Sequence, residues 1–230
     1  MKKPYGRKTK KKVSQLLAGP SQEEALSRLA LIPDEQLVGH LFAHLYHCSE
    51  VIKFRAALAM GDMTERMARH AFEKARIVLR RIMWNLNDES GGIGWGSPEA
   101  MGEVLARSPE LAEEFKSILF SYLDPGGNFI EHEILQRGVI WGIGTFLQAA
   151  PQDLESQTKN RLFGHLHSLD PVVRGYALRA LINARAFDCR IAPEAILSDE
   201  QELAFFDGWD LVPVQVKELA AGCRHHGIYS

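Results

Sequence analysis

The sequence predicts an all-α protein: a short solenoid of stacked two-helix units, an α–α superhelix, that ends in a small β-hairpin. Apolar residues recur at i, i+3, i+4 and i+7 from about residue 21 to 187. Small-residue segments return about every 37 to 42 residues, and strand-forming residues flank an Asp-Gly pair near the C-terminus. We expect a disordered basic tail over 1–12, the solenoid over 13–190, and an extension over 191–230 with the hairpin at about 202–216.

The charge distribution separates the first twelve residues from the rest of the chain. MKKPYGRKTKKK holds seven of the 27 Lys and Arg residues and no acid, which leaves 20 basic against 29 acidic residues, a formal charge near −9. A run of like charge near a terminus is commonly solvated and disordered. Because nucleic-acid affinity needs clustered Lys and Arg, the acidic body disfavours nucleic acid as a partner, and only the tail offers such a cluster.

Helix start signals follow the same periodic pattern. Ser21 with Glu24 forms a capping box, and Ser97-Pro98 and Ser108-Pro109 each place a side-chain acceptor at the N-cap and a proline after it. Short turns join most segments, so successive helices should pack as antiparallel pairs. The predicted helices cover about 21–30, 34–47, 50–61, 64–87, 98–107, 109–123, 131–149, 154–168 and 171–186.

Four segments repeat a pattern of small and apolar residues: 57–61 (ALAMG), 98–102 (PEAMG), 140–144 (IWGIG) and 177–181 (ALRAL). The glycines that end the first three are 41 and 42 residues apart. A helix packed against a neighbouring unit has room for Ala or Gly, but not for Leu, at its closest approach. Periods of this length are typical of two-helix units stacked side by side.

The segment LDPVVRGYALRAL at 169–181 resembles the second helix of a HEAT-like repeat, of the kind found in phycobilisome-lyase-type HEAT proteins. The Asp-Pro opening and Arg174, four residues after Asp170, carry the resemblance. The copy at 49–61 lacks the acid, and the copy around 95–102 has a glycine near the place of the arginine. The resemblance therefore implies no regular ladder of buried arginines.

The run WNLNDESGGIGWG at 84–96, followed by Pro98-Glu99, resembles an uncharacterised HEAT-like family of sulfate-reducing and related bacteria. Together the two resemblances cover about residues 35–187. They imply a HEAT/armadillo-like solenoid and carry no assigned activity.

Beyond the helical part, the runs 202–206 and 209–216 are rich in strand-forming residues and flank Asp207-Gly208, a signal for a two-residue type I′ turn. Pro213 cannot donate a ladder hydrogen bond, so we expect the second strand at an edge or a bulge. A short helix at about 217–222 should follow.

The segment from Asn85 to Gly96 is the main candidate for a binding region. A helix stops there, and a polar cluster gives way to four glycines, with Trp84 and Trp95 at the flanks. Glycines permit close approach of a ligand, and tryptophan offers a large apolar face with one donor. Alternatively, this is a structural loop whose tryptophans fill the core. The run follows a helix and has no GK[ST], which excludes a phosphate-binding loop.

If the following repeat packs alongside, Glu131 or His132 should come near this segment. These residues and Glu133 are consecutive at a helix start, so they point in different directions, and acids there are also expected from the helix dipole. We therefore assign no catalytic residue. The candidate binding surface consists of Trp84, Asn85, Asn87, Asp88, Glu89, Trp95, Glu99, Glu131, His132, Arg137 and Trp141.

Three histidines, His40, His44 and His47, should share the polar face of one helix. His40 and His44 are one turn apart, a spacing that can chelate zinc or nickel. Since no carboxylate or CxxC partner accompanies them, we expect no physiological metal site and no cofactor.

Three function classes follow from these observations. The first is a non-enzymatic interaction module that offers a concave surface to a protein or peptide. The second is a small-ligand-binding protein or enzyme with a central Trp/Asp/Glu pocket, and the third is nucleic-acid binding through the basic tail. Three widely spaced cysteines and the lack of an apolar run of about 18 residues predict a cytoplasmic protein without a membrane span. The sequence names neither the partner nor the oligomeric state.

Overall fold

The computed structural model describes residues 5–86 and 94–222. These ranges contain twelve α-helices and one two-stranded antiparallel sheet. The elements are α1 (Tyr5–Leu17), α2 (Gln22–Leu29), α3 (Asp34–Leu45), α4 (Glu50–His70), α5 (Phe72–Leu86), α6 (Ser97–Arg107), α7 (Pro109–Ser121), α8 (Glu133–Ala149), a 3-10 turn (Pro151–Asp153), α9 (Ser156–His165), α10 (Pro171–Asn183), α11 (Glu194–Leu197), β1 (Glu202–Asp207), β2 (Asp210–Gln215) and α12 (Val216–Gly222).

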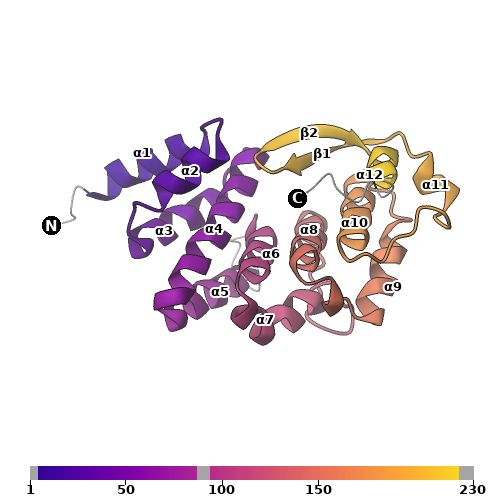
Figure 1. Ribbon diagram of the computed structural model, residues 1–230, viewed down its shortest axis with the longest axis horizontal. Helices are drawn as coiled ribbons and strands as arrows, with labels where there is room; N and C mark the ends of the chain where they lie inside the picture. The colour runs from indigo at the N-terminus through magenta and orange to yellow at the C-terminus, as the bar shows by residue number, and fades with distance from the viewer. Residues whose placement is uncertain (1–4, 87–93, 223–230) are drawn as a thin grey trace.

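The central helices form two layers. Helices α4, α6, α8 and α10 pack side by side in this order, while α3, α5, α7 and α9 lie outside them and each packs on the inner helix that follows it (Figure 1). Glu99 of α6 faces Gly138 of α8, and three residues further along, Gly102 faces Gly142. Since the contacts advance in the same direction along both helices, these inner helices run parallel. The loops that enter the four inner helices therefore lie along one edge of the molecule.

Small residues mark the closest approaches within the inner layer. A Cβ on Gly61 of α4 would overlap Glu103 of α6, and one on Gly102 would overlap the backbone of Gly142. These glycines come from the repeated segments, as the packing argument from the sequence predicts. Gly61 lies inside the continuous helix α4, so the predicted break between 61 and 64 is wrong. The glycine there admits a neighbouring helix and does not end its own.

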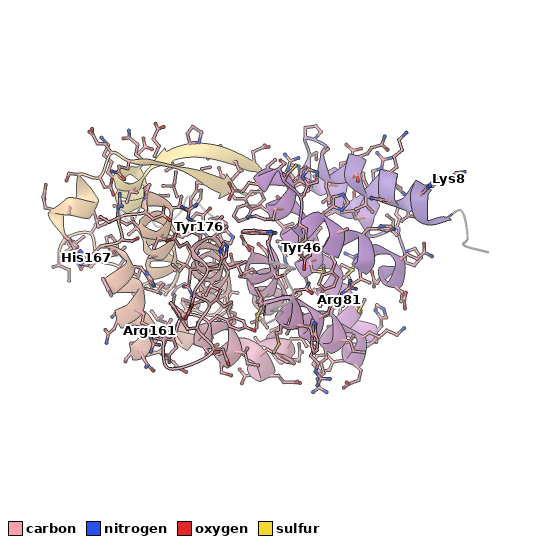
Figure 2. The ribbon with its side chains drawn as sticks, turned by 180° about the vertical axis from the view of Figure 1, so that it is seen from behind. Lys8, Tyr46, Arg81, Arg161, His167 and Tyr176 are labelled. Atoms are coloured by element: carbon pink, nitrogen blue, oxygen red, sulfur yellow. The ribbon has the colours of Figure 1, made fainter. Side chains whose placement is uncertain are left out.

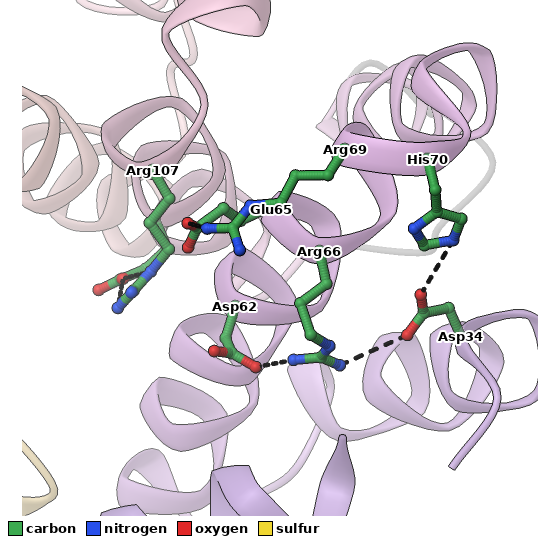
Figure 3. A network of polar contacts seen from close by, with 8 residues as sticks. Asp34, Asp62, Glu65, Arg66, Arg69, His70 and Arg107 are labelled. Carbon is green, nitrogen blue, oxygen red and sulfur yellow. Dashed lines mark hydrogen bonds and ion pairs between the residues drawn. The ribbon is translucent and has the colours of Figure 1, made fainter. Parts of the chain in front are cut away.

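Ion pairs connect neighbouring helices, both within a unit and between units. Figure 3 shows Arg66 of α4 between Asp62 of the same helix and Asp34 of α3, with His70 Nε2 3.8 Å from Asp34. Farther along, Arg161 of α9 pairs with Asp124 at 2.5 Å, 37 residues earlier in the chain. Such pairs are partly exposed and add little stability singly, on the order of 0 to 1 kcal/mol. The separation of 37 residues between Asp124 and Arg161 matches the repeat length found in the sequence.

The β-hairpin crosses the side of the inner layer that faces away from the outer helices (Figure 1). Its register runs from Glu202 paired with Gln215 to Asp207 paired with Asp210. The two turn residues are consequently Gly208 and Trp209, one position later than the predicted Asp207-Gly208 turn. Gly208 has φ of 65°, which an L side chain rarely adopts.

Aromatic rings fix the hairpin to the inner layer. Phe206 of β1 stacks on Phe54 of α4 with ring centroids 4.9 Å apart, and Phe205 meets Trp141 of α8 edge to face at 5.4 Å. Trp141 also contacts Tyr176 of α10 at 4.8 Å. Edge-to-face and offset pairs of this kind add to the stabilisation from apolar burial. The hairpin therefore closes the core across α4, α8 and α10.

The first helix corrects the expectation of a disordered tail over residues 1–12 for its part from residue 5 onward; residues 1–4 lie outside the described residues. Residues 5–17 form α1, which buries Val13, Leu16 and Leu17 against its neighbours. These three residues follow the i, i+3, i+4 pattern of a helix with one apolar stripe. The stripe explains why the segment is helical although its exposed side is basic.

Among the described residues, no helix combines the length and apolar character needed to cross a bilayer.

Candidate functional site

Large apolar side chains are exposed shortly before each inner helix begins, three of them on loops and one, Trp84, in the last turn of α5. We call this surface the loop edge and define it by Tyr46, Trp84, Phe129 and Leu169, which precede α4, α6, α8 and α10 respectively. Trp84 is 73% exposed and Leu169 97%. Each of the four two-helix units thus contributes one such residue. Ile134, in the first turn of α8, is a fifth exposed apolar side chain at this end.

Charged and imidazole groups surround these apolar residues. Glu50, Glu131 and Glu133 are exposed at the starts of α4 and α8. His47 and His167 are exposed on the loops before α4 and α10, and Figure 2 shows Tyr46 and His167 on their respective loops. The apolar residues of the loop edge therefore have polar neighbours, with exposed carboxylates at the starts of α4 and α8.

Trp84 has basic neighbours on α5. Arg80 and Arg81 are exposed within one turn of it, and the guanidinium of Arg81 lies 4.0 Å from the ring centroid of Phe42 on α3. The exposure of Trp84 contradicts the sequence-based alternative in which it fills the core. It stands in the last turn of an outer helix, where the described residues leave its ring exposed.

Trp95 contacts the next unit. Its ring meets that of His132 edge to face, with centroids 5.2 Å apart and an interplanar angle of 88°. Gly96 follows with φ of 72°, and a Cβ there would collide with Lys53 and the carbonyl oxygen of Leu45. The chain therefore makes a glycine-dependent turn into α6 that sets Trp95 against the loop before α8.

Glu99 points inward rather than toward solvent. It is 4% exposed, and its Oε1 lies 3.5 Å from Nζ of Lys53 on α4. Its Oε2 has no hydrogen-bond partner among the described residues. A Cβ at Gly138 would fall 2.7 Å from that oxygen, so the carboxylate is sealed by the backbone of α8. A buried ion pair of this kind joins α4 to α6 and leaves no space for a substrate.

Arg137 and Trp141 are likewise part of the packing between units. Arg137 Nε donates to Asp170 Oδ2 at 2.6 Å, and Asp170 accepts from the backbone N–H of Val172 as the N-cap of α10. Trp141 is 3% exposed, with the guanidinium of Arg179 3.8 Å from its ring centroid. Because the hairpin covers Trp141, this residue is not accessible to a partner.

Two charged groups lie half-buried between the inner helices. Burial raises the pKa of Glu103 above its ordinary value, although Arg107 pairs with it at 3.3 Å. Burial also lowers the pKa of Arg179 to about 10. Arg179 donates to the carbonyl oxygen of Trp141 and to Thr145, so its donors are used within the core. Perturbed groups often mark active sites, but these belong to the packing between helices.

The three histidines His40, His44 and His47 do not share a solvent-facing side, and His47 lies beyond the end of α3. His44 is buried: its Nε2 lies 2.9 Å from Ser14 Oγ, its Nδ1 2.7 Å from the carbonyl oxygen of His40, and its ring stacks on His47. The predicted exposed polar face of this helix is wrong, because α1 packs on α3 there and covers His44. Among the residues that the structure describes, no group of three or more metal-binding side chains gathers.

The remaining candidates divide into three groups. Asn85 is half-buried at the end of α5, and Glu131 is exposed before α8. Asn87, Asp88 and Glu89 lie outside the described residues.

Sequence reasoning missed Tyr46, Phe129 and Leu169 as surface residues. At Leu169 the local signal is misleading. An apolar residue directly before an N-cap, here Asp170, often packs back on its own helix, whereas Leu169 is exposed to solvent.

Comparison with known proteins adds similarity without an activity. No protein-family model matches the chain. The chain is 27% identical over 180 residues to an uncharacterised protein of Archaeoglobus fulgidus, a match that spans 78% of this chain and 91% of the relative. It is also similar to a crystal structure of an engineered protein, with a TM-score of 0.43 and 18% identity over 76% of this chain and 78% of that one.

Proposed function

We propose that this protein is a cytoplasmic, non-enzymatic interaction module, a HEAT-like solenoid that binds a protein or peptide partner along its loop edge. The observation that carries the proposal is an exposed apolar side chain before each of the four inner helices: Tyr46, Phe129 and Leu169 on loops, and Trp84 in the last turn of α5. Single exposed apolar residues are ordinary, but several gathered on one surface with a polar rim are typical of an interaction site.

The architecture supports the HEAT-like part of the proposal. Paired helices stack in two layers, glycines lie at the inner crossings, and an ion pair such as that of Arg161 with Asp124 links residues 37 apart. In a solenoid each unit contacts its neighbours and repeats the same loops on the same edge. That repetition places one apolar residue of each unit on a common surface.

The loop edge is a better docking surface than the inner face. On the inner face, Trp141 is covered by Phe205 and Phe206 of the protein's own hairpin. A partner would have to displace these rings and lose their burial, whereas the side chains of Trp84 and Leu169 are already exposed. Binding at the loop edge therefore requires no rearrangement of the core.

An enzyme or small-ligand pocket receives less support from the geometry. Glu99 is sealed between α6 and α8, and Glu131 and Glu133 are exposed at a helix start. General acid–base chemistry requires titratable groups that converge on one enclosed point. The described residues of the candidate surface instead divide between the packed interior, with Glu99 and Trp141, and an open edge, with Trp84 and Glu131.

The charge of the loop edge indicates the chemistry of the partner. Glu50, Glu131 and Glu133 present carboxylates beside the apolar side chains. Arg80 and Arg81 in turn flank Trp84, so a complementary ligand carries apolar anchors with Lys or Arg opposite the starts of α4 and α8 and an acid opposite Trp84. Apolar anchors supply most of the affinity in such interfaces, while the charges steer the encounter and select the partner.

Two matched double variants test the proposal. Trp84→Ser/Leu169→Ser removes two apolar residues of the loop edge, and Leu31→Ser/Ile191→Ser removes two residues of comparable exposure, 76% and 84%, from other surfaces. Each protein is purified by affinity tag from the native host, and its co-purifying proteins are quantified by mass spectrometry. We expect a stoichiometric partner with wild type and control that is at least tenfold depleted with the loop-edge variant. Equal recovery with both variants would contradict the proposal.

A further inference from the structure

Helix α1 presents an ordered cationic face. Arg7, Lys8, Lys10, Lys11 and Lys12 are all exposed on it, and the helix contains no acid. Within the described part of the chain, none of these five cations lies within ion-pair distance of a carboxylate; the ion pairs found there involve other residues. Figure 2 shows Lys8 at the far end of the molecule, directed away from the body. The cations therefore face solvent from a fixed scaffold.

This arrangement is unfavourable without a ligand. Arg7 with Lys11, and Lys8 with Lys12, are like-charge pairs at i, i+4, and Lys8 with Lys11 is another at i, i+3. Such pairs destabilise a helix, in contrast to the opposite-charge pairs seen elsewhere on the surface, such as Arg28 with Glu24. A bound polyanion would relieve the repulsion. The cations should therefore attract a polyanion, and its binding should stabilise α1.

We propose that the exposed face of α1 binds the phosphodiester backbone of a nucleic acid. Five cations within two turns of a helix match a chain of regularly spaced phosphates, and contacts by Lys and Arg to phosphates carry no base specificity. The rest of the chain is acidic, so it repels nucleic acid and confines the contact to this helix. The surface shares no residue with the loop edge, and the proposal stands independently of the proposed function.

The burial of α1 argues against a membrane as the ligand. A helix that binds a bilayer surface inserts an apolar face between the lipids. In α1 that face consists of Val13, Leu16 and Leu17, which are buried against the protein. Only the charged face remains available. A phosphate polymer needs nothing more than such a face, whereas a stable membrane anchor needs a second, apolar contribution.

The test uses the full chain and two triple variants. Lys8→Gln/Lys11→Gln/Lys12→Gln removes three charges from α1, and Lys74→Gln/Lys159→Gln/Arg190→Gln removes three exposed charges from other surfaces. Binding of a fluorescent 20-nucleotide duplex DNA, single-stranded DNA and RNA is measured by anisotropy from about 50 to 200 mM salt. Circular dichroism and thermal melting confirm that both variants are folded.

We expect wild type and control to bind at low salt and the α1 variant to bind at least tenfold more weakly. For duplex DNA, the slope of log K against log salt should become shallower by about 2.7, since each phosphate contact contributes about 0.9. The ligand should raise the melting temperature of wild type but not of the α1 variant. The DNA and RNA arms identify which polymer binds more tightly.

Several results would overturn the inference. The first is that wild type does not bind nucleic acid at about 50 mM salt. The second is that the control variant binds as weakly as the α1 variant, which would reveal a general charge effect. Tighter binding to vesicles of phosphatidylcholine and phosphatidylserine than to any nucleic acid would assign the surface to membranes. Displacement of the DNA by poly-glutamate at equal charge would assign it to acidic proteins.

Discussion

The guanidinium of Arg55 donates from Nε to the carbonyl oxygen of Trp209 at 2.7 Å, joining residues 154 positions apart. Its other nitrogens donate to the carbonyl oxygens of Leu17 and Gly19 and to Asp210. The same guanidinium stacks on the Trp209 ring, 4.7 Å from its centroid. One side chain of α4 thereby fastens the hairpin tip to the turn after α1.

Replacement of this side chain should release the hairpin tip. Arg55→Ala removes the donor to the carbonyl oxygens of Trp209 and Leu17 and the ion pair with Asp210, so we expect a loss of roughly 3 kcal/mol in the free energy of unfolding. Arg28→Ala, at an exposed pair with Glu24, should cost less than about 0.5 kcal/mol. Urea denaturation measures both. A loss below about 1 kcal/mol for Arg55→Ala would show that the hairpin does not depend on this contact.

The glycine crossing between α6 and α8 gives a second prediction. Gly102→Ala introduces a Cβ into the backbone of Gly142, and overpacking of this kind costs about 1 to 3 kcal/mol. Gly39→Ala is the control, because Gly39 lies inside α3 with open space at its Cβ position. That change should stabilise by roughly 0.5 to 1 kcal/mol through helix propensity. Thermal melts that shift in the same direction for both variants would contradict the packing described.

The two tryptophans of contrasting exposure should behave differently. Trp141→Ala removes the centre of the aromatic cluster and should cost about 3 to 5 kcal/mol of stability. Trp84→Ala removes an exposed ring and should change stability by less than about 0.5 kcal/mol. Chemical denaturation compares them directly. A large loss for Trp84→Ala would mean that the ring supports the fold, and the loop edge would then lose its main anchor.

Acid should weaken the fold through histidines. Burial lowers the pKa of His165 below its ordinary 6.5, and burial, His44 and Lys10 lower that of His40. The unfolded chain therefore takes up protons first, so stability present above pH 6.5 declines as the pH falls from there toward the folded-state values. His165→Gln should flatten the decline between about pH 7 and 5 in urea titrations. His167→Gln, at an exposed position, should leave it unchanged; an equal effect of both would reject a role for His165 burial.

Local signals explain which parts of the fold could be predicted. Helix α10 begins at Pro171 after Asp170, whose side chain caps it, and α7 begins at Pro109, as the Asp-Pro and Ser-Pro pairs predict. Both features act within one turn of the chain, so neighbouring residues suffice. The predicted side-chain caps at Ser97 and Ser108 are wrong, because Ser108 makes no cap hydrogen bond and the N-cap of α6 is Gly96. Helix α1 escaped prediction because its apolar stripe is stable only when α2, α3 and α4 cover it, and those contacts are distant in sequence.

The same distinction applies to the candidate site. The repeat period suggested that His132 should come near Trp95, and the structure brings these rings into contact. The exposure of Trp84 and Leu169 depends on the packing of distant helices, which leaves some helix ends uncovered. A local sequence pattern does not predict this exposure. The one-residue shift of the hairpin turn has a similar cause, because Trp209 Nε1 donates to the carbonyl oxygen of Gly19, 190 residues away.

Site-specific photocrosslinking in the native host tests the loop edge most directly. A benzophenone amino acid replaces Leu169 in one strain and Ile191, another highly exposed apolar residue, in a second. We predict that irradiation produces one dominant covalent adduct from position 169, that Trp84→Ser in the same chain abolishes it, and that position 191 gives none. Equal adducts from both positions, or an adduct at 169 that survives Trp84→Ser, would contradict binding along the loop edge.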